Sequence, residues 1–242
     1  MKWQDKGIIV SVKKYGESSL ILNLLTEKHG LHAGLIKYGS SQKNRNIYQI
    51  GNICKVEWVA RLEDHLGYYK CETEKSISYN LINSSIKINA LMSLTSLVNT
   101  FIADRQVHST LFIESLNLIK YMNYTGDYWL SKYIKWELLF LSELGYGLDL
   151  TECAVTGVKD NLKFISPKSG RAVSKKGAGK WKNKLLILPE FLTNINVNTN
   201  NINELLNGIK ITTFFLDRYA FSVGLKLPHV RDRFTSKIHI IK

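Results

Sequence analysis

One segment of the sequence resembles a phosphate-binding loop. Residues 177–180 read Gly-Ala-Gly-Lys, and in such a loop backbone amides and a lysine hold the phosphates. The loop also needs a glycine five residues before Gly179, where Ser174 stands, and Ser or Thr after the lysine, where Trp181 stands. The spacing therefore predicts a solvated basic turn and no nucleotide site.

Two other segments lack a residue that their chemistry requires. Residues 16–20 begin like a nucleophile elbow but lack its final glycine. His29 and His32 flank a turn without the glutamate or the spacing of a zinc hydrolase, and no grouped carboxylates resemble a two-metal nuclease. We expect no catalytic residue, no metal site and no cofactor, and predict that the protein is not an enzyme. A metal-dependent nuclease stays as an alternative, which magnesium-dependent cleavage would reveal.

Basic and aromatic side chains give the stronger signal. The chain has 33 Lys and Arg against 20 Asp and Glu, a formal net charge of +13, which indicates a polyanionic partner. Lysines interleaved with tyrosines near the N-terminus fit a groove that binds single-stranded DNA through phosphate contacts and base stacking. Each residue alone could equally be ordinary surface charge or barrel wall, but the cluster favours binding. The residues predicted to bind DNA there are Lys13, Lys14, Lys37, Tyr38, Lys43 and Arg45, and Tyr15 and Tyr48 are interleaved with them.

A second basic segment covers residues 158–184, with nine basic side chains and one acidic. We predict DNA contacts from Lys175, Lys176 and Lys180, while a merely solvated lobe remains the alternative. A small apolar core is expected to hold this lobe. Its predicted members are Leu162, Phe164, Ile165, Trp181, Leu185 and Leu186.

The first 75 residues alternate apolar and polar side chains with a period of two, as in Ile8, Val10 and Val12. Turn residues separate five such runs at spacings near ten residues. This pattern predicts a small antiparallel barrel, and an OB-fold is the expected one at this size. Trp58, between Val56 and Ala60, is predicted to lie in the core.

From about residue 76 the apolar period becomes three to four, which predicts helices. Asp127 is the expected N-cap of an apolar helix, and a last long helix is expected to start near Asn201. The predicted fold class is α+β, with an N-terminal five-stranded OB-fold barrel and then an α-helical domain carrying a small β-hairpin insertion. The predicted domains are residues 1–75 and 76–242, with the basic insertion at about 150–190.

No stretch approaches the ~20 apolar residues of a membrane helix. The N-terminus does not resemble a signal peptide. Three widely spaced cysteines do not form a disulfide framework. We therefore expect a cytoplasmic protein with no membrane contact.

Several motifs, in their order and spacing, resemble the RecO family of DNA repair mediators over nearly the full chain. The resemblance rests on Gly7-Ile8-Ile9-Val10, Gly16-Glu17-Ser18-Ser19 and the run 25–30 near the N-terminus. Further along it rests on the runs 143–150 and 166–171.

The resemblance implies DNA repair and recombination, with an OB-fold joined to a helical domain. It implies binding of single- and double-stranded DNA, annealing of complementary strands and association with the nucleoid. The implied partners are the C-terminal tail of the single-strand-binding protein (SSB), RecR and often RecF, and indirectly RecA, which is loaded on SSB-coated DNA. A nonspecific RNA-binding OB-fold protein remains the alternative, and competition between RNA and DNA would separate the two.

The resemblance bears on two further sites. An acidic, apolar-ended tail would need a hydrophobic pocket with a basic rim. The candidates for that rim are Arg105, Arg218, Arg231 and Arg233. Some members hold zinc with four cysteines in the insertion, but here Cys153 remains, with Thr156 and Ser174 near two other ligand positions. A structural zinc wants four ligands, so we expect a metal-free insertion.

Overall fold

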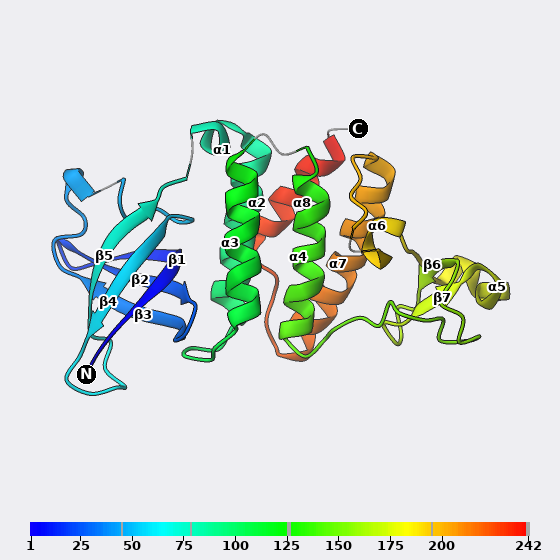
Figure 1. Cartoon of the computed structure of the whole chain (residues 1–242), viewed down its shortest axis with the longest axis horizontal. Helices are drawn as coiled ribbons and strands as arrows, with labels where there is room; N and C mark the ends of the chain where they lie inside the picture. Colours follow the sequence, from blue (N-terminus) through cyan, green and yellow to red (C-terminus); the bar gives the residue numbers. More distant parts are fainter. Residues whose placement is uncertain (45, 78, 125–126, 195, 241–242) are drawn as a thin grey trace. The chain divides into compact units, whose positions relative to one another are not determined.

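A computed structural model describes residues 1–44, 46–77, 79–124, 127–194 and 196–240 (Figure 1). Its first five strands form a closed barrel in the order β1-β2-β3-β5-β4, which confirms the predicted OB-type barrel and the α+β class. The strands are β1 (Lys2–Tyr15), β2 (Ser19–Thr26), β3 (Gly30–Ile36), β4 (Ile53–Val59) and β5 (Tyr68–Lys75).

The long strand β1 takes part in two ladders. Its first half pairs with β4 and its second half with β2, both antiparallel, and its register shifts between Ile9 and Ser11. Such a bulge bends a strand and lets it turn from one side of a barrel to the other. Strands β3 and β5 close the barrel in parallel, through the pair Leu35 and Tyr68.

The barrel core follows the period of two along most of β2, whereas in β1 the consecutive residues Ile8, Ile9 and Val10 are all buried. Ile9, Leu22 and Leu24 are fully buried, and Trp58 is buried as predicted. The Trp58 indole N–H donates to the Leu66 carbonyl at 2.9 Å, so the buried ring leaves no polar atom unsatisfied. Gly67 follows with a φ of +63°, and a Cβ there would lie 2.3 Å from the Trp58 Nε1, so only glycine fits.

Helices follow the barrel. Ser84 caps α2, and Asn201 caps α7 through its side chain, close to the predicted helix start. The prediction for Asp127 is wrong, because α4 starts one residue later than expected and its N-cap, Tyr128, offers no side-chain cap. The helices are α1 (Tyr79–Asn83), α2 (Ser85–Phe101), α3 (Ser109–Asn123), α4 (Trp129–Glu143), α5 (Lys175–Ala178), α6 (Glu190–Thr193), α7 (Ile202–Ser222) and α8 (His229–Ile240), with 3-10 turns η1 (Gln42–Asn44) and η2 (Gly179–Lys184).

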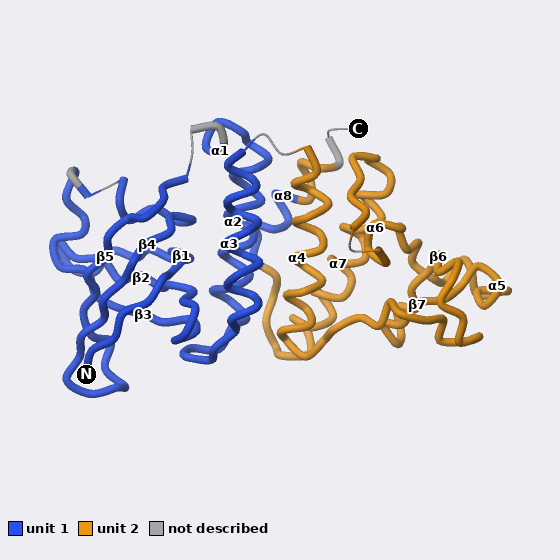
Figure 2. The backbone as a smooth tube through the Cα atoms, viewed as in Figure 1, with its two compact units in different colours: residues 1–124, 228–234 blue, residues 125–227, 235–242 orange. Residues whose placement is uncertain are grey.

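The chain divides into two compact units (Figure 2). Unit 1 comprises residues 1–124 and 228–234, and unit 2 comprises residues 125–227 and 235–242. Strands give way to helices after β5, yet α2 packs on β1 and α3 contacts β2 within unit 1. A hydrogen bond of 2.8 Å from the Asn23 amide to the Asn99 side chain links β2 to α2. The barrel therefore shares a compact unit with the first helices.

The insertion in unit 2 is a small sheet in the order β7-β6-β8. The antiparallel pair β6 (Leu162–Ile165) and β7 (Ala172–Ser174) is the predicted hairpin, and β8 (Leu186–Ile187) adds a third strand. Leu162, Phe164 and Ile165 are buried as predicted, but the prediction for Trp181 is wrong, since its side chain is 54% exposed. The turn η2, on which Trp181 lies, buries no residue, and the buried Leu188 lies near this core instead.

Among the helices in the described part of the chain, none has both the length and the apolar character that crossing a lipid bilayer requires.

Candidate nucleic-acid interface

Two turns meet at one end of the barrel. The Ser40 amide donates to the Ser18 carbonyl at 3.0 Å, and the Ser40 hydroxyl donates to the Glu17 carbonyl at 3.2 Å. These bonds join the β1–β2 turn to the segment after β3. Lys14 pairs with Leu20, and Leu20 with Ile36, the residue before Lys37. Lys14 of β1 and Lys37, the residue after β3, therefore lie on either side of β2.

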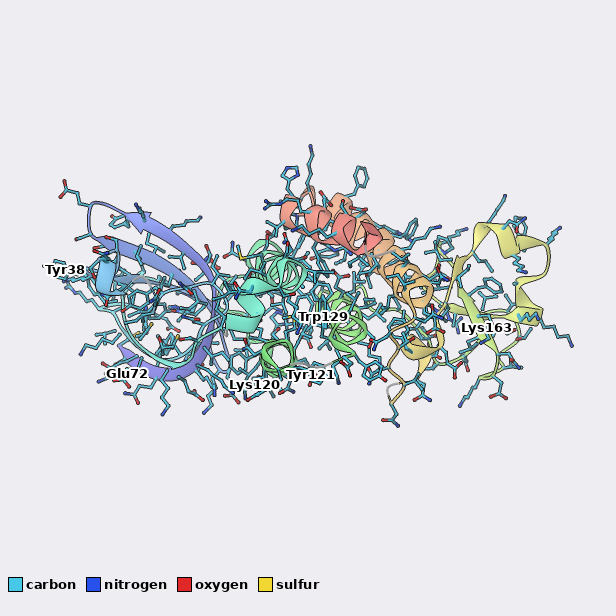
Figure 3. All side chains as sticks on the ribbon, turned by 90° about the horizontal axis from the view of Figure 1, so that it is seen from above. Tyr38, Glu72, Lys120, Tyr121, Trp129 and Lys163 are labelled. Atoms are coloured by element: carbon cyan, nitrogen blue, oxygen red, sulfur yellow. The ribbon has the colours of Figure 1, made fainter. Side chains whose placement is uncertain are left out.

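Three exposed tyrosines lie where β1 and β3 end and where β5 begins. The exposed fractions are 56% for Tyr15, 71% for Tyr38 and 48% for Tyr68. The Lys37 ammonium lies 4.5 Å from the centre of the Tyr68 ring, a cation–π contact. Together, Lys13, Lys14, Tyr15, Lys37, Tyr38 and Tyr68 form what we call the barrel-end cluster. Figure 3 labels Tyr38 at this end, on the segment that leads to η1.

The sequence did not single out Tyr68. It lies thirty residues after Tyr38, and only the pairing of its backbone with Leu35 brings it beside β3. The sequence does place an aromatic residue, Tyr68, at the start of this strand, but it does not show which other strand lies beside it.

Tyr38 has a φ of +57°, in the left-handed region. That conformation costs a non-glycine residue about 1 kcal/mol. The Asn44 amide donates to the Tyr38 carbonyl at 3.2 Å and helps to hold it. Backbone strain of this kind gathers at functional sites, where the surroundings maintain it.

The cluster lysines differ from those on the barrel wall. Within the described residues, Lys13, Lys14 and Lys37 are exposed and form no ion pair with a carboxylate. Lys2, by contrast, pairs with Glu57 at 2.8 Å, and Lys6 pairs with Glu74 at 2.6 Å. A DNA phosphate can therefore reach the cluster ammonium groups without displacing an acidic partner.

Three other predicted or neighbouring residues have different outcomes. Arg45 lies outside the described residues, as does the side chain of Lys43. Tyr48 is half-buried and packs against the barrel core, where burial raises its pKa. It is part of the barrel wall, and its ring is less exposed than those of Tyr15, Tyr38 and Tyr68.

The insertion places its predicted lysines on the surface. Lys175 and Lys176 lie on α5, Lys180 lies on η2, and all three are exposed. Ser174 caps α5 by accepting from the Gly177 amide at 3.0 Å. Figure 3 labels Lys163 on β6 of the same small sheet.

The residues around Cys153 do not fit a structural zinc. The Ser174 amide donates to the Cys153 sulfur at 3.2 Å, and the hydroxyls of Thr156 and Ser174 are 3.3 Å apart. A Cβ at Gly177 would lie 2.9 Å from that sulfur, so the absent side chain makes room for it. These residues, with a single thiol, offer a hydrogen-bonded clasp in place of a four-ligand site.

His29 and His32 are engaged within the barrel. The ring of His29 lies 3.0 Å from the Asp5 carboxylate and stacks on Trp3. His32 is buried against the Tyr69 hydroxyl at 2.9 Å, and burial lowers its pKa to about 4. Within the described residues, no group of three or more His, Cys, Asp or Glu is arranged to hold a metal ion.

The four candidate arginines are in different surroundings. Arg105 pairs with Asp64 at 3.3 Å, Arg231 is fully buried, and Arg233 is exposed on α8. Arg218 lines a pocket of about 200 Å³ in unit 2 with Tyr146 and Phe215. Its guanidinium donates to the carbonyls of residues 167 and 168 at 2.8 and 3.0 Å.

Comparisons with known proteins bear on this site. Residues 1–76 match the family described as Recombination protein O N terminal, and residues 84–228 match Recombination protein O C terminal. The chain is 38% identical over 237 residues to DNA repair protein RecO of Wolbachia sp. subsp. Drosophila simulans (strain wRi), covering 96% of this chain and 98% of the relative. It is 39% identical over 236 residues to DNA repair protein RecO of Ruegeria sp. (strain TM1040), covering 97% of each.

The chain belongs to the RecO family. This confirms the resemblance found in the sequence and the predicted connection with DNA repair and recombination. Within the family, the barrel-end cluster belongs to the N-terminal domain, and Cys153 and the lobe lysines belong to the C-terminal domain.

Proposed function

We propose that the chain is a DNA repair mediator that binds single- and double-stranded DNA and anneals complementary strands. Its role is binding and not catalysis, in the cytoplasm and near the nucleoid. The observation that carries the proposal is the barrel-end cluster, where exposed tyrosines lie beside lysines that have no carboxylate partner among the described residues. Tyrosine rings stack on bases and lysines contact phosphates, and neither contact reads sequence.

Annealing needs no covalent chemistry. Two DNA strands repel each other at every phosphate, and a protein that neutralises phosphates on both strands releases counterions and lowers this repulsion. Two basic surfaces on one chain suit this role, and base pairing then supplies the free energy. The surfaces we propose are the barrel-end cluster, in residues 1–75, and Lys175, Lys176 and Lys180 of the insertion in residues 76–242.

The proposed partners are the acidic C-terminal tail of SSB, RecR with or without RecF, and indirectly RecA on SSB-coated DNA. For the tail, we propose the pocket lined by Arg218 and Phe215. A phenylalanine wall suits an apolar end, and the guanidinium lies at the same pocket to attract a carboxylate.

The test is a strand-annealing assay with two complementary oligonucleotides, one labelled with a donor dye and one with an acceptor. We expect the full chain to accelerate annealing, and to do so also when SSB coats both strands. Competition with single-stranded RNA of the same sequence should weaken DNA binding less than competition with DNA. A preference for RNA would favour the nonspecific RNA-binding alternative, and magnesium-dependent cleavage of either strand would contradict the non-enzymatic proposal.

A further inference from the structure

Trp181 is an exposed indole in the most basic part of the chain. All five tryptophans lie in the described part of the chain, and Trp181 alone belongs to the exposed class, at 54%. Between Asn161 and Pro189 the sequence has eight basic residues and no carboxylate side chain. A single exposed aromatic side chain is common on protein surfaces, so the case for a site here rests on the charges around the ring.

Two ammonium groups lie close to the indole. The Lys180 Nζ is 5.5 Å from the ring centre, and the Lys184 Nζ is 5.0 Å from it. Both lysines are exposed and belong to the same 3-10 turn, η2. The turn thus presents one flat apolar ring with two positive charges close to it, one from Lys180 and one from Lys184.

We propose that Trp181 is a stacking platform for an unpaired base of single-stranded DNA, with Lys180 and Lys184 on the adjacent phosphates. This inference rests on the proposed function and deepens it, because it assigns the insertion to unpaired DNA instead of to phosphates of any strand. Stacking of a base on an indole is stronger than an exposed cation–π contact, so a base displaces the ammonium groups from the ring. The displaced ammonium groups then contact the phosphates on either side of that base.

A pocket beside the platform extends the path. It has a volume of about 250 Å³ and is lined by Lys182 and Asn183 of η2, by Leu186 and by Asn207 and Lys210 of α7. Amide side chains can bond to base edges, and ammonium groups to phosphates. An apolar protein surface would be a poor occupant, because docking on Trp181 would desolvate the two ammonium groups beside it.

The test uses the full chain, a fluorescein-labelled oligothymidine and a blunt duplex of the same length. Trp181→Ala should weaken binding of oligothymidine roughly five- to a hundredfold. Binding of the duplex, whose bases are stacked within the helix, should change by less than about twofold. Trp181→Phe, which keeps a ring, should retain most of the affinity. The matched control is Phe221→Ala on α7, which removes an aromatic side chain that is 87% exposed.

A second readout follows the indole of Trp181 itself. Oligothymidine should quench the intrinsic tryptophan fluorescence. It should also protect this fluorescence from quenching by acrylamide. Both effects should be absent in Trp181→Phe. Unchanged oligothymidine affinity in Trp181→Ala, with the wild-type chain binding normally, would overturn the platform and leave the proposed function standing. An equal loss for both ligands would also overturn it, in favour of a structural role. If the wild-type chain bound neither ligand, the proposed function would fail together with the platform.

Discussion

The backbone amide of Ser174 donates a hydrogen bond to the buried sulfur of Cys153, 21 residues earlier in the chain. Burial raises the pKa of this thiol, but hydrogen bonds from the Ser174 hydroxyl and amide and from the Thr156 hydroxyl outweigh it and lower the pKa to about 6. The thiolate form of Cys153 is therefore favoured in the folded lobe, where these hydrogen bonds take the place of a metal ion.

A depressed thiol pKa predicts that stability depends on pH. Between about pH 6 and the ordinary value of 9, the unfolded chain binds more protons than the folded chain. The contribution of the Cys153 thiolate to the stability of the folded chain is thus complete above pH 9 and is lost as the pH falls to about 6. Relative to Cys153→Ala, wild-type stability should rise over this range by up to about 4 kcal/mol.

Urea denaturation of both chains in reductant at several pH values measures this difference. The other two thiols are present in both chains and serve as an internal control. A gap between wild type and variant that does not widen with pH would exclude the thiolate clasp. Elemental analysis of protein purified without chelator should also find well under one zinc per chain.

The lysines of the barrel-end cluster should set the salt dependence of single-strand binding. Changing Lys13, Lys14 and Lys37 together to Gln should weaken binding and flatten the slope of log K against log salt by about 2, because each lost phosphate contact removes roughly 0.7. Lys70→Gln is the matched control, since Lys70 is exposed but lies 3.8 Å from Glu57. Fluorescence anisotropy across a salt series gives both quantities, and a wild-type slope in the triple variant would place the site elsewhere.

The lobe lysines should matter for annealing more than for stability. Replacing Lys175, Lys176 and Lys180 by Ala removes three charges from exposed positions, where substitutions usually change stability by less than about 0.5 kcal/mol each. The annealing rate should fall severalfold while the melting temperature stays nearly constant. The same annealing rate as wild type would leave the lobe as a solvated appendage.

Tyr38 should show a conflict between stability and binding. Tyr38→Gly relieves a left-handed backbone and should stabilise the chain by up to about 1 kcal/mol, offset in part by the greater freedom of glycine in the unfolded state. The same change removes a ring that is 71% exposed, so single-strand affinity should fall. Tyr15→Gly, at a residue without positive φ, is the control and should not stabilise. Equal affinity of Tyr38→Gly and wild type would show that the ring does not stack on DNA.

The pocket at Arg218 should take the acidic tail. Arg218→Gln removes the positive charge and should weaken binding of a labelled SSB tail peptide roughly tenfold or more, since bonds to charged groups are worth about 1.5–3 kcal/mol. Arg233→Gln, at an exposed arginine on α8, is the control. Titration by anisotropy with the full chain measures both. An equal effect of the two variants would point to general attraction between charges.

The barrel was predictable because half of each strand faces a core, which writes a period of two into the sequence. Trp58 and the start of α7 near Asn201 followed from the same kind of local pattern. Trp181 was misplaced because its size and apolar character are those of a core residue, while its exposure depends on how η2 folds. Tyr68 was missed because its place beside β3 depends on a contact between distant segments.

The parallel closure of the barrel has a consequence for the bound state. The described backbone pairing between β3 and β5 is the one pair Leu35 and Tyr68, and the Leu35 amide donates to the Gly67 carbonyl at 3.0 Å. The Tyr69 hydroxyl adds side-chain contacts to His32 across the same two strands. Because this pairing has so few backbone hydrogen bonds, it is where the barrel should open locally most readily. Tyr38 follows β3 and Tyr68 begins β5. DNA that stacks on both rings would therefore link the two strands. DNA binding and opening of the β3–β5 pairing are then linked. Bound DNA disfavours the opening, and a change that weakens the β3–β5 pairing also weakens DNA binding.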